Sequence, residues 1–163
     1  MKNESLEALY EQYAGELYRY AFALCRNRIQ AQELVSDTFF QALLSLKEEH
    51  EGLKWWLFRV CKNLWLDGLR RQKHVGEQPP DWDALPAEGN LTQGVIAREE
   101  QQRVYRAVLA LSPPAYRQVV SLFYYGGLSL KEVAEVMDTT PGAARTLLCR
   151  ARQKLKIALE GQL

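Results

Sequence analysis

A stretch without helical periodicity divides this chain into two parts. Residues 74–93, HVGEQPPDWDALPAEGNLTQ, contain three prolines and two glycines, whereas apolar residues recur at intervals of three and four on both sides. Proline lacks a backbone N–H and disfavours helical geometry at the residue before it, so one helix cannot continue through this segment. The sequence therefore predicts an all-α fold of two small helical domains, residues 1–74 and 95–163, joined by a flexible acidic linker at residues 75–94.

Length and composition exclude several classes of protein. A chain of 163 residues with 47% hydrophobic residues can bury two small cores and is too apolar for disorder. No segment approaches the roughly 18 consecutive apolar residues of a membrane span. The N-terminus, MKNESLEALYEQY, has no apolar signal core. We therefore expect a cytoplasmic protein with no membrane insertion of its own.

The net charge of +1 is distributed unevenly along the chain. Residues 54–73 hold six cations and one anion, and residues 140–163 hold five cations and one anion. Between these blocks, residues 74–93 hold four anions and neither Lys nor Arg. Two basic blocks separated by an acidic one are typical of a protein that contacts a polyanion at two places.

No group of side chains points to catalysis or to a bound metal. Cys25, Cys61 and Cys149 are far apart, and the chain has neither a CxxC pair nor a His/Cys cluster. His50 and His74 fall in predicted loops, and no phosphate-binding GxxxxGK[ST] loop occurs. We expect no catalytic residues, no metal and no cofactor, and an enzyme on an all-α scaffold is the least favoured alternative.

The basic block at residues 54–73, KWWLFRVCKNLWLDGLRRQK, has two different helical faces. At roughly 100° per residue, one face is apolar and comprises Leu57, Phe58, Val60, Cys61, Leu64, Trp65 and Leu69. The other face combines an indole, an amide and cations in Trp55, Arg59, Lys62, Asn63, Arg70 and Lys73, with Leu66 among them. Cations neutralise phosphates and rings stack on unpaired bases, so this face is suited to nucleic acid. The alternatives are a solvated basic face or a docking surface for a protein.

Two helices are predicted before this block, at residues 4–26 and 29–46. The second has a predicted core face formed by Leu34, Phe39, Ala42, Leu43 and Leu46. Its polar positions include Glu33, Ser36 and Asp37. Judged by composition alone, ordinary solvation is the favoured explanation for this acidic surface.

The second half begins with two predicted helices, at residues 95–111 and 115–124. Ser112 is the expected cap of the second of these, because a proline follows it at the first turn. The two glycines at residues 126–127 are expected to end it.

A helix-turn-helix pattern follows. Ser129 and Glu132 have capping-box spacing before a short helix at residues 130–137, and Thr140 with Pro141 marks the start of a longer basic helix. A short helix, a tight turn and a basic helix favour DNA binding. A helical hairpin with a solvated basic face would have the same pattern.

Several sequence motifs occur in a fixed order along the chain. AQELVSDTF at residues 31–39 matches A-E-D-L-x-Q-x-x-F, and WLFRVCKNLWLDGLR at residues 56–70 matches W-L-x-x-I-A-x-N-x-x-x-D-x-x-R. P-x-x-x-R occurs at residues 113–117, YYGGLSLKEVA at 124–134 matches Y-x-x-G-L-S-x-x-E-I-A, and GAARTLLCRAR at 142–152 matches G-T-V-K-S-R-L-x-R-A-R. In this order and spacing, the chain resembles a bacterial RNA polymerase sigma factor of the extracytoplasmic function (ECF) group of the sigma-70 family.

The resemblance implies a non-catalytic protein that binds core RNA polymerase and directs promoter-specific transcription initiation. Residues 1–74 would be sigma domain 2 and residues 95–163 sigma domain 4. The helix at residues 29–46 resembles the one that docks on the coiled coil of the β′ subunit, which places Glu33, Ser36 and Asp37 at that interface. The resemblance also implies contact with the β flap and an anti-sigma factor as a further partner.

The resemblance implies two contacts with promoter DNA. The helix at residues 54–73 resembles the one that recognises and melts the minus-10 element, through Trp56, Arg59, Asn63, Arg70, Arg71 and Lys73. The second helix of the helix-turn-helix would enter the major groove of the minus-35 element, with contacts from Arg145, Thr146, Cys149, Arg150 and Arg152.

Some positions depart from the family pattern. Ser36 replaces a usual glutamine, Asp138 a turn glycine and Cys149 a bulkier residue. Aspartate tolerates the left-handed conformation better than most residues do. The main alternative is a stand-alone helix-turn-helix repressor or activator with a regulatory N-terminal domain. That alternative leaves the aromatic, basic helix at residues 54–73 and the acidic linker unexplained.

Overall fold

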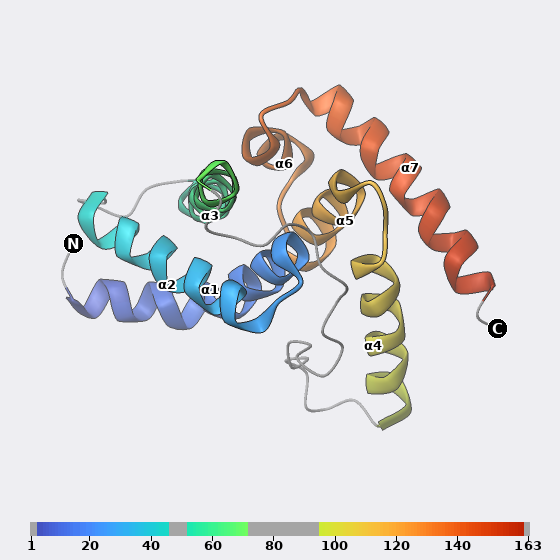
Figure 1. Cartoon of the computed structure of the whole chain (residues 1–163), viewed down its shortest axis with the longest axis horizontal. Helices are drawn as coiled ribbons and strands as arrows, with labels where there is room; N and C mark the ends of the chain where they lie inside the picture. The colour runs from blue at the N-terminus through green and yellow to red at the C-terminus, as the bar shows by residue number, and fades with distance from the viewer. Residues whose placement is uncertain (1–2, 46–51, 72–94, 162–163) are drawn as a thin grey trace.

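The computed structural model describes residues 3–45, 52–71 and 95–161, and these residues form α-helices and one π-helical turn, with no strand among them (Figure 1). The first half contributes α1 Asn3–Cys25, α2 Arg28–Ser45 and α3 Leu53–Arg70. The second half contributes α4 Val95–Leu109, α5 Pro114–Val120, the π-helical turn η2 Ser121–Tyr125, α6 Leu130–Met137 and α7 Pro141–Glu160. The all-α prediction is confirmed, while the predicted linker and Lys73 lie outside the described residues.

The helices α1, α2 and α3 pack against one another as a three-helix bundle. The rings of Tyr20 on α1 and Phe58 on α3 meet edge-on, with centroids 5.4 Å apart. The chain reverses between α1 and α2 at Arg26, which has a φ of 55°. Asn27 then begins α2, because its side-chain oxygen accepts a hydrogen bond from the Gln30 N–H at 3.0 Å.

The sequence specifies the ends of the helix-turn-helix. At the start of α6, the Ser129 hydroxyl accepts a bond from the Glu132 N–H at 3.1 Å, and the Glu132 carboxylate accepts one from the Ser129 N–H at 2.9 Å. At the start of α7, the Thr140 hydroxyl accepts a bond from the Ala143 N–H at 3.1 Å. Both predicted caps are therefore confirmed.

The start of α5 differs from the prediction. Its N-cap is Pro113 instead of Ser112, and no side chain caps it. Pro114 occupies the first helical position, and a proline excludes helical geometry from the residue before it. Pro113 therefore adopts the extended N-cap conformation, with φ −70° and ψ 168°.

The two halves of the chain pack against each other. In Figure 1, α5 lies beside α1 and α6 lies beside α3, in agreement with the contacts between these helices. Arg117 on α5 is only 2% exposed, and its guanidinium donates to the carbonyls of Ala23 at 2.7 Å and Leu111 at 3.3 Å. The Tyr105 hydroxyl donates to the Arg19 carbonyl at 3.2 Å. The bonds to Ala23 and Arg19 join α1 to the second half, and the buried apolar residues of both halves form one continuous cluster.

Candidate nucleic-acid interface

The apolar face of α3 fixes the orientation of its polar face. Leu57, Phe58, Cys61 and Trp65 are buried in the three-helix bundle, as the sequence predicts. Leu69, which was predicted on the same face, is exposed near the end of the helix. Burial raises the pKa of the Cys61 thiol to about 12, and the hydrogen bond with Thr38 lowers it only in part. Cys61 is therefore a protonated core residue with no role as a nucleophile.

The start of α3 depends on a glycine. Gly52 is the N-cap, with a left-handed φ of 83°. A Cβ at this position would lie 2.3 Å from Nε1 of Trp55. The Trp55 ring therefore lies against the turn that begins the helix and packs on the core. Trp55, which the sequence places on the polar face of this helix, therefore also has a structural role.

The polar face of α3 brings several of the predicted minus-10 residues together. Trp56 and Arg59 are half-buried, and Asn63 is exposed one helical turn beyond Arg59. Arg70 and Arg71 are exposed at the end of the helix, where they lie 3.7 Å and 3.4 Å from the carboxylate of Asp67. The structure thus separates a cluster near Arg59 and Asn63 from a pair of arginines at the helix end.

The Arg59 guanidinium contacts the helix-turn-helix. It lies 3.1 Å from Oδ1 of Asp138 and 3.8 Å from Oε2 of Glu135. Lys62, one turn along α3, is half-buried. Burial lowers the pKa of its ammonium, the nearby Asp138 carboxylate raises it, and Arg59 lowers it. Two cations of α3 therefore face the acidic end of α6.

The helix α7 presents its predicted contact residues to solvent. Ala144, Leu148 and Ala151 are buried beneath it, at the three- and four-residue spacing of an apolar helical face. On the outer side, all of the predicted minus-35 residues are exposed: Arg145, Thr146, Cys149, Arg150 and Arg152. The five side chains therefore share one accessible surface of a basic helix.

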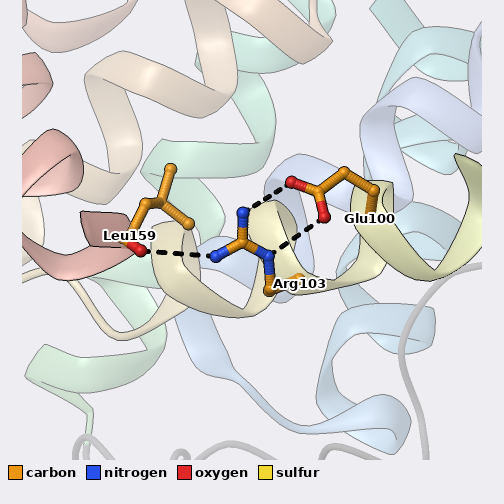
Figure 2. Close-up of polar contacts among 3 residues, drawn as sticks. All are labelled: Glu100, Arg103 and Leu159. Atoms are coloured by element: carbon orange, nitrogen blue, oxygen red, sulfur yellow. Dashed lines mark hydrogen bonds and ion pairs between the residues drawn. The ribbon is translucent and has the colours of Figure 1, made fainter. Parts of the chain in front are cut away.

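Some polar side chains of α7 and α4 brace the second half. The Arg152 guanidinium donates to the Tyr124 hydroxyl, and Lys154 donates to the Ser112 carbonyl at 2.7 Å. In Figure 2, the Arg103 guanidinium on α4 binds the Glu100 carboxylate on one side and the Leu159 carbonyl of α7, at 3.4 Å, on the other. Only part of the charge in this basic region is thus available to a ligand.

The polar residues predicted to bind polymerase lie on the outer surface of α2. Glu33 and Asp37 border a groove of about 700 Å³ between the start of α2 and the end of α3, which Asp67 and Arg71 also line. Ser36 instead lines a shallower groove of about 430 Å³ between α1 and α2. The two carboxylates and Ser36 therefore border different grooves on the outer surface of α2.

Large apolar side chains accompany these polar residues, and sequence reasoning missed them. Ile29, Phe40 and Leu44 are 62%, 57% and 65% exposed, and Leu43, which was predicted in the core, is 39% exposed. Ile29, Glu33, Phe40 and Leu44 follow helical spacing along one side of α2, and that spacing was the available signal. An exposed stripe of apolar and acidic side chains is typical of a surface that binds a partner protein.

Comparison with known proteins identifies two conserved regions of one family. A model of sigma-70 region 2 matches residues 9–75, and a model of sigma-70 region 4 matches residues 101–155. The ECF RNA polymerase sigma factor SigM of Bacillus subtilis is 28% identical over 157 residues, which cover 93% of each chain. The ECF sigma factor SigE of Mycolicibacterium smegmatis is 30% identical over 155 residues, which cover 93% of this chain and 60% of that protein.

Solved structures agree on the fold. The sigma factor RpoE of Bartonella quintana, in complex with the anti-sigma factor NepR, matches with a TM-score of 0.73 at 21% identity and covers 96% of this chain and 98% of that one. CnrH in complex with the cytosolic domain of CnrY matches with a TM-score of 0.70 at 22% identity and covers 99% and 92%. Both matches extend over the two helical halves.

The chain belongs to the sigma-70 family of RNA polymerase sigma factors, within the ECF group. It is a promoter-directing subunit of RNA polymerase and has no catalytic activity of its own, as the resemblance implied. None of the helices in the described residues is long and apolar enough to cross a membrane. The described part of the chain also has no group of three His, Cys, Asp or Glu side chains placed to hold a metal ion.

Proposed function

We propose that this sigma factor divides promoter recognition between α3 and α7, in domains that comprise residues 1–74 and 95–163 on either side of the linker at residues 75–94. The observation that carries this assignment is the surface of α7. Its small residues Gly142 and Ala143 lie exposed at the start of the helix, and its arginines follow on the same outer surface. Small residues let a helix approach the major groove, and arginines bind guanine edges and phosphates there.

In this proposal α7 recognises the minus-35 element as duplex DNA. Arg145, Thr146, Cys149 and Arg150 face the groove, and Arg152 contacts the backbone. The Thr140 cap and the N-terminal end of the helix dipole add a favourable electrostatic site for a phosphate. The buried stripe beneath α7 keeps these side chains in register.

The helix α3 recognises the minus-10 element as a melted strand. An exposed amide such as that of Asn63 can hydrogen-bond the edge of an extruded base, and the neighbouring Trp56 and Arg59 offer a ring and a cation to it. Arg70 and Arg71 are exposed for phosphates, and Lys73 continues the same series in the sequence. Capture of unpaired bases then opens the duplex without nucleotide hydrolysis.

The polymerase-binding surface of this proposal lies on α2. Glu33 and Asp37, with the exposed Ile29, Phe40 and Leu44 around them, present charge and apolar area to the β′ coiled coil. Ser36 completes the surface from the side of α1. The second domain binds the β flap, and the protein acts in the cytoplasm with its polymerase.

An anti-sigma factor is the proposed regulator. The structural relatives RpoE and CnrH were each solved in complex with a partner, the anti-sigma factor NepR for RpoE and the cytosolic domain of CnrY for CnrH. In this chain such a partner would cover the segment from Glu33 to Asp37 together with the domain 4 surface. Competition between the partner and core polymerase in a pull-down tests this, and simultaneous binding would contradict it.

Reconstituted transcription tests the whole assignment. Purified protein and core polymerase are incubated with genomic templates, and the start sites are mapped. Promoter opening is measured by the permanganate reactivity of unpaired thymines. Asn63→Ala should abolish this opening while binding to core polymerase is unchanged. Lys131→Ala, exposed on α6 outside both proposed DNA surfaces, is the control. Equal loss of opening and polymerase binding would show that the faces of α3 are assigned wrongly.

The stand-alone repressor makes a different prediction. Such a protein would bind a duplex operator tightly without polymerase and would give no promoter-specific transcript on any template. That pair of results would contradict the proposed function.

A further inference from the structure

Two carboxylates of the helix-turn-helix occupy the cationic face of α3. Asp138 and Glu135 lie 3.1 Å and 3.8 Å from the Arg59 guanidinium, which comes from the other half of the chain. The half-buried Lys62 lies one turn further along α3, near Asp138. A guanidinium forms charge-assisted hydrogen bonds with carboxylate and with phosphate oxygens, so these carboxylates and a nucleic-acid phosphate would bind the same group.

The packing of the helices holds these carboxylates in place. The helix α6 packs directly on α3, and α5 with η2 packs on α1. The buried Arg117 guanidinium bonds the carbonyl of Ala23 and so secures the second of these contacts. Arg59 is 38% exposed in this arrangement, whereas the DNA-facing arginines of α7 lie open to solvent.

The backbone at Asp138 adds a second observation. Asp138 ends α6 in the left-handed conformation, with φ 54° and ψ 50°. Glycine adopts this conformation without steric penalty, whereas an L-residue is disfavoured there. The aspartate thus has no advantage for the turn itself, and its carboxylate is the group that reaches Arg59.

We propose that Asp138 and Glu135 form an intramolecular latch on Arg59 that competes with single-stranded promoter DNA for α3. The inference rests on the proposed function, because it takes α3 as the minus-10 reader. In the latched state the chain can bind duplex DNA through α7 but not an unpaired strand through α3. Separation of the two halves, as polymerase engages each of them, releases Arg59 for DNA.

The experiment measures opening and DNA binding separately. Ser45→Cys on α2 and Gln153→Cys on α7 carry a donor and an acceptor dye in a Cys149→Ser background, and single-molecule energy transfer reports closed and open populations. Both positions are exposed, and Cys25 and Cys61 are buried with the pKa of each thiol raised to about 11 and about 12. The dyes therefore attach at the two chosen sites.

The latch is removed by Glu135→Gln with Asp138→Asn. Asparagine also tolerates the left-handed conformation, so the turn is preserved. Because partly exposed ion pairs are weak, the open-to-closed ratio should rise by about 2- to 5-fold. Raising the salt concentration should shift the wild-type chain in the same direction. Glu7→Gln with Glu11→Gln, which removes the same charge from the exposed surface of α1, should leave the ratio unchanged.

The DNA probe is a fluorescein-labelled single strand of 20 nucleotides of mixed sequence. Its fluorescence anisotropy is measured as the full-length chain, without dyes, is added. The latch-free variant should bind it about 2- to 5-fold more tightly than the Glu7/Glu11 control does, and Arg59→Ala should abolish that difference. An unchanged open-to-closed ratio would overturn the latch.

Opening without any gain in single-strand binding would overturn the competition instead. It would also locate the failure in the assignment of α3, because the latch itself would have been released. Tighter binding that persists in the Arg59→Ala background would overturn Arg59 as the latched group.

Discussion

The helices α3 and α7 are both amphipathic and basic, but their cationic faces are covered to different extents. Each buries a narrow apolar stripe, and each is proposed to bind one promoter element. The cationic face of α3 is half-covered by α6, with Arg59 paired to Asp138 and Glu135, whereas the corresponding face of α7 is exposed. Two helices with the same amphipathic, basic character therefore differ in their availability to a ligand, and the difference comes from packing between the halves.

This difference matches the order in which a promoter can be bound. Duplex DNA exists before initiation, so a surface for the minus-35 element can be open at all times. An unpaired minus-10 strand exists only after melting, and an exposed cationic face on α3 would meanwhile bind any polyanion. If α3 reads the minus-10 strand as proposed, its coverage by α6 in the free chain would suppress non-specific binding at the site that is needed last.

The largest expected effect comes from breaking the packing between the halves. Arg117→Ala leaves the buried carbonyls of Ala23 and Leu111 without donors and creates a cavity, so we expect a loss of about 3 kcal/mol in the free energy of unfolding. For a chain of this size that corresponds to a fall of about 6–12 °C in Tm. Chemical denaturation measures the free energy of unfolding and thermal denaturation measures the Tm. In this variant the cationic face of α3 should become as accessible to nucleic acid as that of α7.

Arg150→Ala is the control for that loss. Its side chain is exposed on α7, so its effect on unfolding should stay within about 0.5 kcal/mol. Equal destabilisation by the two substitutions would show that Arg117 does not hold the halves together.

The next effect contrasts the two helices as DNA readers. Arg150→Ala should weaken binding to a duplex that carries the mapped minus-35 element by about 1–3 kcal/mol, because a bidentate contact to a guanine or a phosphate is lost. Arg59→Ala should leave binding to that duplex unchanged, since α3 does not take part in it. Fluorescence anisotropy at fixed salt measures both, and a comparable loss for Arg59→Ala would remove the functional distinction between the helices.

A smaller effect contrasts the ways in which the helices begin. At α3, Gly52→Ala combines a left-handed φ with a Cβ placed 2.3 Å from Trp55, and should cost about 2 kcal/mol of stability. At α7, Thr140→Ala removes one capping hydrogen bond and should cost about 1 kcal/mol. Urea denaturation measures both. Thr140→Ser keeps the hydroxyl and should change stability by only a few tenths of a kcal/mol.

The features that sequence reasoning predicted correctly are local ones. The capping box of Ser129 and Glu132 and the cap at Thr140 lie within three residues of the groups they bind, so they define α6 and α7 from the sequence alone. The left-handed geometry of Asp138 was also accessible, because it follows from the turn between two capped helices. Most of the apolar face of α3 follows from helical periodicity.

The features that were missed depend on distant parts of the chain. Arg59 and Asp138 are separated by 79 positions, and Arg117 and Ala23 by 94, so no periodicity relates them. Leu43 matched a core position by spacing, but it borders an open groove between α1 and α2 and is exposed with Phe40 and Leu44. The Ser112 cap failed because the geometry that Pro114 imposes on Pro113 takes precedence over side-chain capping.

The smallest expected effect leaves the fold intact and compares the reactivity of cysteine thiols beneath α3 with that of the thiol on α7. Cys61 on α3 and Cys25 on α1 are buried, and desolvation raises the pKa of their thiols to about 12 and about 11, whereas Cys149 on α7 is exposed. At pH 8 a disulfide reagent should therefore modify one thiol of the native chain and three after denaturation.

The same two thiols make stability fall at alkaline pH. In the unfolded chain they ionise near their ordinary pKa of 9.0, but in the folded chain they stay protonated to about pH 11 or 12. Above pH 9 the folded state therefore binds more protons than the unfolded state, and the free energy of unfolding should decrease until the folded pKa values are passed. Cys61→Ala should flatten this decrease, whereas Cys149→Ala should leave it unchanged.

In the assay with the disulfide reagent at pH 8, rapid modification of two or more thiols of the native chain would contradict this difference between the helices. It would show that the core beneath α3 is as open to the reagent as the surface of α7.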